Sequence, residues 1–339
     1  MSRIVVLGAG SWGTALAQIL SYNGHDVILW GRNQAQMAEM SKLKVNKKYL
    51  PQVTLSSTLI CTSEWPSLDH CDYVLVSVPA QKQRLLLEEH LDDLKNSTAI
   101  FIDVAKGIET STQKCLHEIY EELLGDIKER YVVLSGPSHA EEFGLNMPTA
   151  LVATAYNHSH AIKVQELFMN DNVRVYTSED VIGVELAGAL KNVIALAIGM
   201  TIGLGYGDNA QAALMTRGLA EITRLGVALG AEPYTFLGLT GVGDLIVTCT
   251  SMHSRNRRAG MMIGEGKTLN EVLDCMGMVV EGAMTTKAAY QLAKKHEIEM
   301  PILEQMYKVL YEEADVNEAA RTLLTRTQRS EYESYLMRN

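Results

Sequence analysis

Residues 3–17 constrain the possible fold more than any other stretch of the chain. A short apolar run over residues 3–7 leads into Gly8-x-Gly10-x-x-Gly13, and a helical pattern follows at once. This order of strand, glycine turn and helix is typical of a dinucleotide-binding βαβ unit, and the context disfavours a glycine-rich turn without a ligand. Gly8 permits the tight turn, Gly10 lets a pyrophosphate approach the backbone, and Gly13 allows close packing of helix on strand. The N–H groups at the helix start would then face the pyrophosphate.

The residues after the second expected strand bear on the choice of cofactor. That strand covers residues 26–30, and Gly31-Arg32-Asn33 follow it. An NAD-specific protein usually has Asp or Glu here to bind the ribose 2′-hydroxyl, and this chain has neither. The Arg32 guanidinium is instead a good partner for a 2′-phosphate. We therefore expect NADP(H), with NAD(H) also possible; the alternative is that Arg32 is a solvated loop residue.

Strand-like and helix-like segments alternate over the first half of the chain. Further strands are expected at residues 72–79, 98–102, 131–134, 149–154 and 173–177, with helices around residues 33–43, 80–91, 110–124 and 158–169. This alternation predicts a Rossmann-type doubly wound, mostly parallel sheet. Ligands bind outside the carboxyl ends of the strands in such sheets. The loops 77–80, 103–107 and 135–140 are therefore candidates for ligand binding.

Two of these loops carry chemically useful groups. Lys106 follows a strand end, so its side chain is expected to point toward the ligand. Gly136-Pro137-Ser138 offers backbone N–H groups and a hydroxyl to a phosphate. The alternatives are a solvated lysine and an ordinary Gly-Pro-Ser turn.

Strand patterns stop near residue 182, and helical periodicity continues to the C-terminus. We therefore predict an α/β fold with two domains: an NAD(P)-binding Rossmann domain (residues 1–182) and an all-helical substrate-binding and catalytic domain (residues 183–339). Lys191 lies in an expected helix that is apolar on all sides and hence buried. Burial lowers the pKa of a lysine toward neutrality, which suits a general acid or base. The alternative is that Lys191 extends from the domain junction into solvent.

Further candidates lie along the second half. Asp244 follows a Gly-x-Gly turn and is a candidate partner for a lysine or for a substrate hydroxyl. Residues 254–258, Ser-Arg-Asn-Arg-Arg, form the densest basic cluster in a chain of net charge −10. With Ser254 as N-cap, Arg255 and Asn256 would lie in a first helical turn that suits a phosphate; the alternative is a solvated charged face. Asp208 is expected to be the N-cap of the helix over residues 208–230.

Composition disfavours several other classes of protein. The net charge of −10 argues against nucleic acid as a partner. Five widely spaced cysteines without a CxxC motif fit reduced thiols in a cytosol, so neither disulfides nor a metal is expected. The first strand begins at Arg3, which leaves no room for a signal peptide. The longest apolar run, residues 193–206, is too short to span a membrane. We thus expect a cytoplasmic protein that is not embedded in a membrane.

Several ordered blocks carry a resemblance that covers nearly the whole chain. They are residues 8–15, 30–32, 105–107, 135–138, 188–195, 243–245, 248–250, 254–258 and 279–282. Together they resemble the bacterial NAD(P)-dependent glycerol-3-phosphate dehydrogenase family. The resemblance implies reversible reduction of dihydroxyacetone phosphate to sn-glycerol 3-phosphate for glycerophospholipid biosynthesis. It also leads us to expect a homodimer.

The resemblance implies roles for individual residues. The cofactor would be bound by Gly8, Gly10, Ser11, Trp12, Gly13, Arg32, Lys106, Ala140, Arg255, Val279 and Glu281. The substrate would be bound by Lys106, Gly136, Ser138, Lys191, Asp244, Ser254, Arg255 and Asn256. Lys191 would be the proton donor and acceptor. Two other functions remain open: a related 3-hydroxyacid or 6-phosphogluconate-like dehydrogenase, and a non-catalytic NADP(H)-binding sensor.

Overall fold

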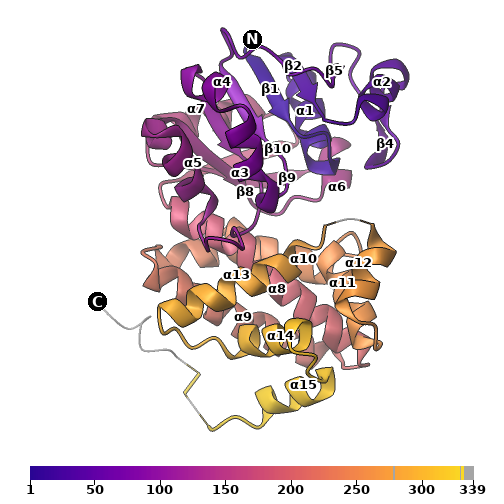
Figure 1. Ribbon diagram of the computed structural model, residues 1–339, viewed down its shortest axis with the longest axis vertical. Coiled ribbons are helices and arrows are strands. Elements are labelled where there is room, and N and C mark those ends of the chain that lie inside the picture. Colours follow the sequence, from indigo (N-terminus) through magenta and orange to yellow (C-terminus); the bar gives the residue numbers. More distant parts are fainter. Residues whose placement is uncertain (278, 329, 332–339) are drawn as a thin grey trace. The chain divides into compact units, whose positions relative to one another are not determined.

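The computed structural model describes residues 1–277, 279–328 and 330–331. The chain divides into two units, which Figure 1 colours from indigo to yellow along the sequence. The sheet unit comprises residues 1–106 and 116–181, and the helical unit comprises residues 107–115 together with the chain from Ile182 onward. The predicted domain boundary lies after residue 182 and leaves residues 107–115 in the first domain. The structure groups this segment with the helical unit instead, because Ile108 and Cys115 belong to its hydrophobic core.

The sheet unit contains ten strands among its described residues. They are β1 (Arg3–Leu7), β2 (Asp26–Trp30), β3 (Val45–Asn46), β4 (Leu50–Thr54), β5 (Ile60–Thr62), β6 (Tyr73–Val76), β7 (Ile100–Asp103), β8 (Tyr131–Ser135), β9 (Thr149–Ala155) and β10 (Val173–Ser178). Eight of them form one sheet in the order β10-β9-β8-β7-β6-β1-β2-β5. The six strands from β5 to β8 follow the order of a dinucleotide-binding sheet, in which the ligand site lies at the reversal beside β1.

Most of the strand pairs in this sheet are parallel, as the sequence predicted. β9 is the exception, because it pairs antiparallel with β8, and β10 then runs parallel to β9. The alternation of strands and helices did not reveal this reversal. The two-stranded antiparallel sheet of β3 and β4 and the edge strand β5 were also missed, because each is short and lacks a clear period-two pattern.

Helices cover the main sheet on both faces, so its central strands are apolar and fully buried. The α-helices of this unit are α1 (Ser11–Tyr22), α2 (Gln34–Leu43), α3 (Ala80–Glu89), α4 (Leu91–Asn96), α5 (Leu116–Leu124), α6 (Ala140–Gly144) and α7 (His158–Phe168). α1 packs against α6 and α7, while α3 packs against α4 and α5. These two groups position the strand ends, and the loops that follow them, on a rigid support.

The helical unit contains only helices and turns among its described residues. Its α-helices are α8 (Val181–Gly203), α9 (Asp208–Ala228), α10 (Asp244–Thr250), α11 (Arg255–Gly264), α12 (Leu269–Met276), α13 (Glu281–Lys295), α14 (Pro301–Tyr311) and α15 (Val316–Leu324). One expected cap was wrong. Gly207 is the N-cap of α9, and Asp208 is the first helical residue, where its charge still favours the helix start.

α8 is the central element of the helical unit, as its apolar sequence predicted. Among the described residues it is the one helix long and apolar enough to cross a membrane, but 94% of its most apolar window is buried, as in a core helix. α8 and α11 approach backbone to backbone. A Cβ at Gly199 would lie 2.1 Å from the Arg257 carbonyl oxygen, and one at Gly260 would lie 2.0 Å from that of Leu196. This close contact fixes the start of α11 relative to α8.

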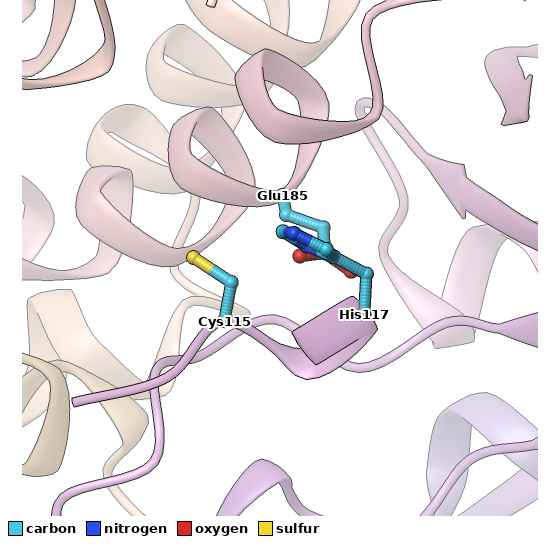
Figure 2. A group of neighbouring side chains, drawn as sticks. All are labelled: Cys115, His117 and Glu185. Atoms are coloured by element: carbon cyan, nitrogen blue, oxygen red, sulfur yellow. The ribbon is translucent and has the colours of Figure 1, made fainter. Parts of the chain in front are cut away.

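The segment of residues 107–115 ends beside the first turns of α8. Figure 2 shows Cys115 and Glu185, both of the helical unit, together with His117, which belongs to the sheet unit. The Cys115 sulfur and a Glu185 carboxylate oxygen lie within 4.8 Å of each other, and both side chains are buried.

Candidate functional site

The three glycines of the N-terminal turn are constrained in different ways. Gly8 has a φ of +117°, and a Cβ there would lie 2.7 Å from the Ser77 carbonyl oxygen. A Cβ at Gly13 would lie 2.0 Å from the Gly8 carbonyl oxygen, so α1 and β1 pack too closely for a side chain. A Cβ at Gly10 would meet nothing within 4 Å. The fold therefore requires Gly8 and Gly13, whereas Gly10 borders open space.

The start of α1 is suited to an anion. Gly10 is the N-cap and offers no side chain, so the first N–H groups of α1 are not capped by it. Trp12 packs on Phe143 at 4.9 Å between ring centroids, and its buried Nε1 has no hydrogen-bond partner within the described residues. Ser11 is half-buried in the same turn, and Ala140 is buried at the start of α6, which packs on α1. Open space, uncapped N–H groups and an unsatisfied indole donor fit a phosphate-bearing cofactor.

Arg32 lies two residues after the end of β2, in the turn that the sequence predicted. Its guanidinium Nη2 lies 2.5 Å from the Glu89 Oε2 at the end of α3, and both side chains are half-exposed. The Asn33 side chain accepts a hydrogen bond from the Gln36 backbone and so caps α2. Arg32 is therefore the cation that this turn offers to a 2′-phosphate.

Lys106, Gly136 and Ser138 come together in the sheet unit. The Lys106 ammonium group donates to the Gly136 carbonyl and to the Ser138 hydroxyl, each at 3.0 Å. The Ser138 hydroxyl in turn donates to the Gly136 carbonyl at 2.8 Å. Gly136 has a φ of +119°, which favours glycine, and its Cβ would crowd β9. Two loops that are 30 residues apart thus present a cation and a hydroxyl at one place.

Asp103 supports this arrangement and was missed as a site residue. It ends β7 and is fully buried. Its carboxylate accepts hydrogen bonds from Gln83 at 2.8 Å, from the Ala105 backbone at 2.9 Å and from the Tyr131 hydroxyl at 3.0 Å. The bond to Ala105 holds the residue directly before Lys106. No local pattern identifies this role, because the donors come from three separate elements.

Lys191 lies at the centre of α8 and is buried, with 6% of its surface exposed. Its ammonium group pairs with the Asp244 carboxylate and donates to the Thr248 hydroxyl at 2.6 Å. The expectation of a carboxylate partner for the lysine is therefore confirmed, although Asp244 begins α10 rather than standing on a loop. The opposite charge of Asp244 stabilises the ammonium form, whereas burial opposes it. The Lys191 ammonium group is thus held in a fixed position by two polar partners.

The thiol of Cys249 lies near this pair but is not available for chemistry. Burial, together with a smaller effect of the Asp244 charge, raises the pKa of Cys249 to about 12, although Lys191 and Arg257 lower it. The thiol therefore stays protonated at neutral pH and behaves as a small apolar group.

The basic cluster forms the first turn of α11, as predicted. The Ser254 side chain accepts a hydrogen bond from the Arg257 backbone at 3.2 Å, which confirms the expected N-cap. Arg255 is half-buried, and its guanidinium donates to the Val279 carbonyl at 3.3 Å. The N-terminus of a helix that carries an arginine favours phosphate binding, because the backbone N–H groups and the guanidinium both donate hydrogen bonds to an anion.

Asn256 connects this helix start to two other helices. Its amide nitrogen donates to Asn192 on α8, and its amide oxygen accepts from the Gly282 backbone in α13, each at 2.9 Å. Glu281 begins α13, and Val279 precedes it with an exposed side chain. The predicted residues Lys191, Asp244, Ser254, Arg255, Asn256, Val279 and Glu281 all belong to the helical unit. The hydrogen bonds of Asn256 hold Lys191's helix, the basic cluster and α13 in one arrangement.

The helical unit also contains a cavity of about 790 Å³ that no sequence pattern predicted. Mostly apolar side chains of α8, α9, α14 and α15 line it, together with Arg217, Glu221 and Arg224. None of the predicted site residues lines this cavity. Its walls come from helices far apart in sequence, so only the folded chain brings them together.

Comparison with known protein families gives a match over most of the chain. Residues 3–161 match the family model described as NAD-dependent glycerol-3-phosphate dehydrogenase N-terminus, and residues 180–321 match the corresponding C-terminus model. The chain is 52% identical over 333 residues to the glycerol-3-phosphate dehydrogenase (NAD(P)+) of Enterococcus faecalis, covering 98% of each protein. It is 50% identical over 335 residues to the enzyme of the same name from Bacillus subtilis, covering 98% of this chain and 97% of that one.

Solved structures give a consistent result. The crystal structure of glycerol-3-phosphate dehydrogenase from Coxiella burnetii has a TM-score of 0.91 at 37% identity, covering 96% of this chain and 99% of that one. The Saccharomyces cerevisiae enzyme has a TM-score of 0.78 at 26% identity, covering 95% and 99%. D-mandelate dehydrogenase, at 15% identity and a TM-score of 0.62, shares the fold alone.

Proposed function

Because the chain belongs to the NAD-dependent glycerol-3-phosphate dehydrogenase family, we propose that it reduces dihydroxyacetone phosphate reversibly to sn-glycerol 3-phosphate with NAD(P)H. The observation that carries this proposal is the buried Lys191 ammonium group, held by Asp244 and Thr248 in a chain that matches the family over nearly its full length. The product is the backbone of glycerophospholipids, so the activity serves their synthesis. The enzyme acts in the cytoplasm, as a homodimer.

Most of the proposed cofactor-binding residues belong to the sheet unit. NADPH or NADH supplies the hydride when bound. Gly8, Gly10 and Gly13 shape the turn, and the backbone N–H groups at Ser11 and Trp12 face the pyrophosphate. Arg32 pairs with a 2′-phosphate, and Ala140 on α6 lies next to the cofactor. Lys106, Arg255, Val279 and Glu281 complete the proposed set of cofactor-binding residues.

Lys191 supplies the proton. Hydride addition to a ketone carbon builds negative charge on the carbonyl oxygen, and the Lys191 ammonium group stabilises that charge and donates the proton to it. Asp244 and Thr248 hold the Lys191 Nζ in one position, so little reorganisation is needed as the charge develops. In the reverse direction neutral Lys191 accepts the proton from the substrate hydroxyl.

The remaining residues bind and orient the substrate. Arg255 and the first N–H groups of α11, which begins after Ser254, bind its phosphate. Asn256, Lys106, Gly136 and Ser138 supply further hydrogen bonds. Binding energy from the remote phosphate helps to orient the reacting carbonyl.

The activity is tested by adding dihydroxyacetone phosphate and NADPH to the purified protein and following NADPH oxidation. The family match favours this substrate over the two alternatives, a 3-hydroxyacid dehydrogenase and a sensor that binds NADP(H) without turnover. Turnover of 6-phosphogluconate or another hydroxyacid in its place would favour the first alternative. Cofactor binding with no turnover on any of these substrates would favour the second.

The role of Lys191 is tested by Lys191→Ala. General acid catalysis contributes about 10²- to 10⁴-fold, so kcat should fall by that factor. The NADPH dissociation constant should stay within about two-fold, because no cofactor-binding role is assigned to Lys191. The matched control is Lys287→Ala, which removes a lysine from the helical unit that has no proposed role. Near-normal turnover of a folded Lys191→Ala protein would contradict the assignment.

A further inference from the structure

Arg32, the proposed partner of a cofactor 2′-phosphate, forms an ion pair with Glu89 in the sheet unit. Arg32 follows β2 by two residues, at the position where dinucleotide-binding sheets contact the adenosine ribose. Its Nη2 lies 2.5 Å from the Glu89 Oε2. Within the described residues this is the one ion pair that Arg32 makes. A carboxylate therefore already occupies the guanidinium that a 2′-phosphate would need.

The location of Glu89 is unfavourable for its own helix. It is the last residue of α3, where the negative end of the helix dipole repels a carboxylate, and α3 has no basic residue in its last turn. Both members of the pair are half-exposed, and an ion pair so exposed adds little to stability. Neither the helix nor the fold accounts for Glu89 at this position.

An aromatic cluster holds the end of α3 beside the end of β2. His90, the C-cap of α3, stacks on Trp65 with ring centroids 3.4 Å apart. Trp30, the last residue of β2, packs edge-on against Trp65 at 5.1 Å and against His90 at 6.1 Å. The indole nitrogen of Trp30 donates to the Ser63 carbonyl at 3.2 Å. Glu89 is therefore kept within reach of Arg32 by rigid neighbours on both sides.

We propose that Glu89 is a specificity-determining residue, which competes with the 2′-phosphate of NADPH for the Arg32 guanidinium and so lets the enzyme use NADH as well. The inference rests on the proposed dinucleotide-dependent function. NADPH binding must exchange the Glu89–Arg32 pair for a phosphate–Arg32 pair, whereas NADH leaves the pair intact. The 2′-phosphate therefore adds less to the binding affinity of NADPH, and the affinities for NADPH and NADH become more similar.

The test measures dissociation constants of NADPH and NADH directly, by calorimetric titration without substrate. Removing an exposed competing charge is worth roughly a factor of three to ten, so Glu89→Gln should tighten NADPH by about that factor and leave NADH within about two-fold. Glu88→Gln is the matched control, because it removes the same charge from the exposed neighbouring residue on α3. It should leave the ratio of the two constants unchanged.

A second arm asks whether Glu89 acts through Arg32. In an Arg32→Gln background the Glu89→Gln change should no longer tighten NADPH. In the wild-type background the gain should shrink in about 1 M salt, where charges are screened within about 3 Å. An NADPH gain that persists without Arg32, or an unchanged cofactor ratio in Glu89→Gln, would overturn the inference while the proposed function stands. Failure of the wild-type protein to bind either cofactor would overturn both.

Discussion

Gly10 and Gly13 stand three residues apart in one turn, and the structure predicts opposite consequences for a methyl group at each. The backbone at Gly10 is extended, with φ −77° and ψ −175°, and a Cβ there meets no protein atom within 4 Å. Gly10→Ala should therefore fold with unchanged or slightly higher stability. The added methyl enters the space proposed for the pyrophosphate, so NADPH should bind about 10- to 100-fold more weakly.

Gly13→Ala provides the contrast for this prediction. Its Cβ would lie 2.0 Å from the Gly8 carbonyl oxygen, so α1 must move away from β1. The free energy of unfolding should fall by about 1–3 kcal/mol or more, as for other overpacked sites. Urea denaturation and NADPH titration of both variants separate the two effects. Equal losses of stability, or unimpaired NADPH binding by Gly10→Ala, would contradict the assignment of Gly10.

Local sequence patterns correctly predicted those residues whose position depends only on the helix in which they lie. Ser254 was correctly expected to cap a helix, and Lys191 to be buried, because cap chemistry and an apolar helix face are visible over a few residues. Asp103, Thr248 and Glu89 were not predicted. Each acts through a contact with a residue that lies on another turn or element. Such contacts cannot be predicted from the spacing of residue types along the sequence.

Glu221 connects two elements, the middle of α9 and the start of α14. Its buried carboxylate accepts hydrogen bonds from the backbone N–H groups of Ile302 at 2.8 Å and Leu303 at 3.2 Å. Burial raises the pKa of Glu221 from 4.5 to about 7, although those two bonds, Arg224 and Arg326 all lower it. The folded protein therefore holds this proton at pH values where the unfolded chain has released it.

The consequence is a loss of stability as pH rises. Below about pH 4.5 the Glu221 carboxyl is protonated in both the folded and the unfolded state. Between about pH 4.5 and 7 it is ionised in the unfolded chain but still protonated in the folded protein, so the free energy of unfolding falls by up to about 3 kcal/mol. Above about pH 7 both states are ionised and the free energy of unfolding levels off. Glu221→Gln should remove this slope, because it keeps an acceptor for α14 and cannot ionise. Urea denaturation from pH 4.5 to 8 tests this, with Glu304→Gln on α14 as control. Parallel pH profiles of wild type and Glu221→Gln would contradict it.

Element type was more predictable than element pairing. The strands at residues 3–7, 26–30 and 131–134 and the long buried α8 were expected, because each has a strong apolar pattern. The antiparallel direction of β9 was not, since strand direction is set by which helices and loops precede it. The close contact of α8 with α11 was missed for a related reason: the glycines at 199 and 260 matter only when both helices are present.

The whole molecule has two separate hydrophobic cores, one for each unit. The predicted fold class, a Rossmann-type sheet followed by helices, is confirmed by the strand order and by the Coxiella burnetii enzyme. Residues 107–115 escaped the prediction because they contain no strong periodic pattern, and their place depends on packing against the core of the helical unit. Hydrophobic periodicity thus predicted where the sheet unit gives way to helices, but it did not predict that residues 107–115 pack with the helical unit.

The distribution of tryptophan makes the proposed cofactor binding measurable in the intact protein. Trp12, Trp30 and Trp65 are the three tryptophans of the chain, and all belong to the sheet unit. Their emission wavelength therefore reports the unfolding of the unit that is proposed to bind NADPH. A ligand that binds only the folded state at about 100 times its dissociation constant adds about 2.7 kcal/mol of stability, which corresponds to roughly 5–10 °C for a unit of this size.

We expect NADPH to raise the midpoint of the tryptophan transition by that amount, in a thermal scan followed by emission wavelength. At the same NADPH concentration, Gly10→Ala should show a much smaller shift, because its unliganded stability is unchanged while its cofactor affinity is lower. Inorganic phosphate is the control for nonspecific ionic stabilisation and should shift both proteins equally. A wild-type midpoint that stays constant over a hundred-fold range of NADPH would contradict the placement of the cofactor on the sheet unit, since binding to the folded state necessarily stabilises it.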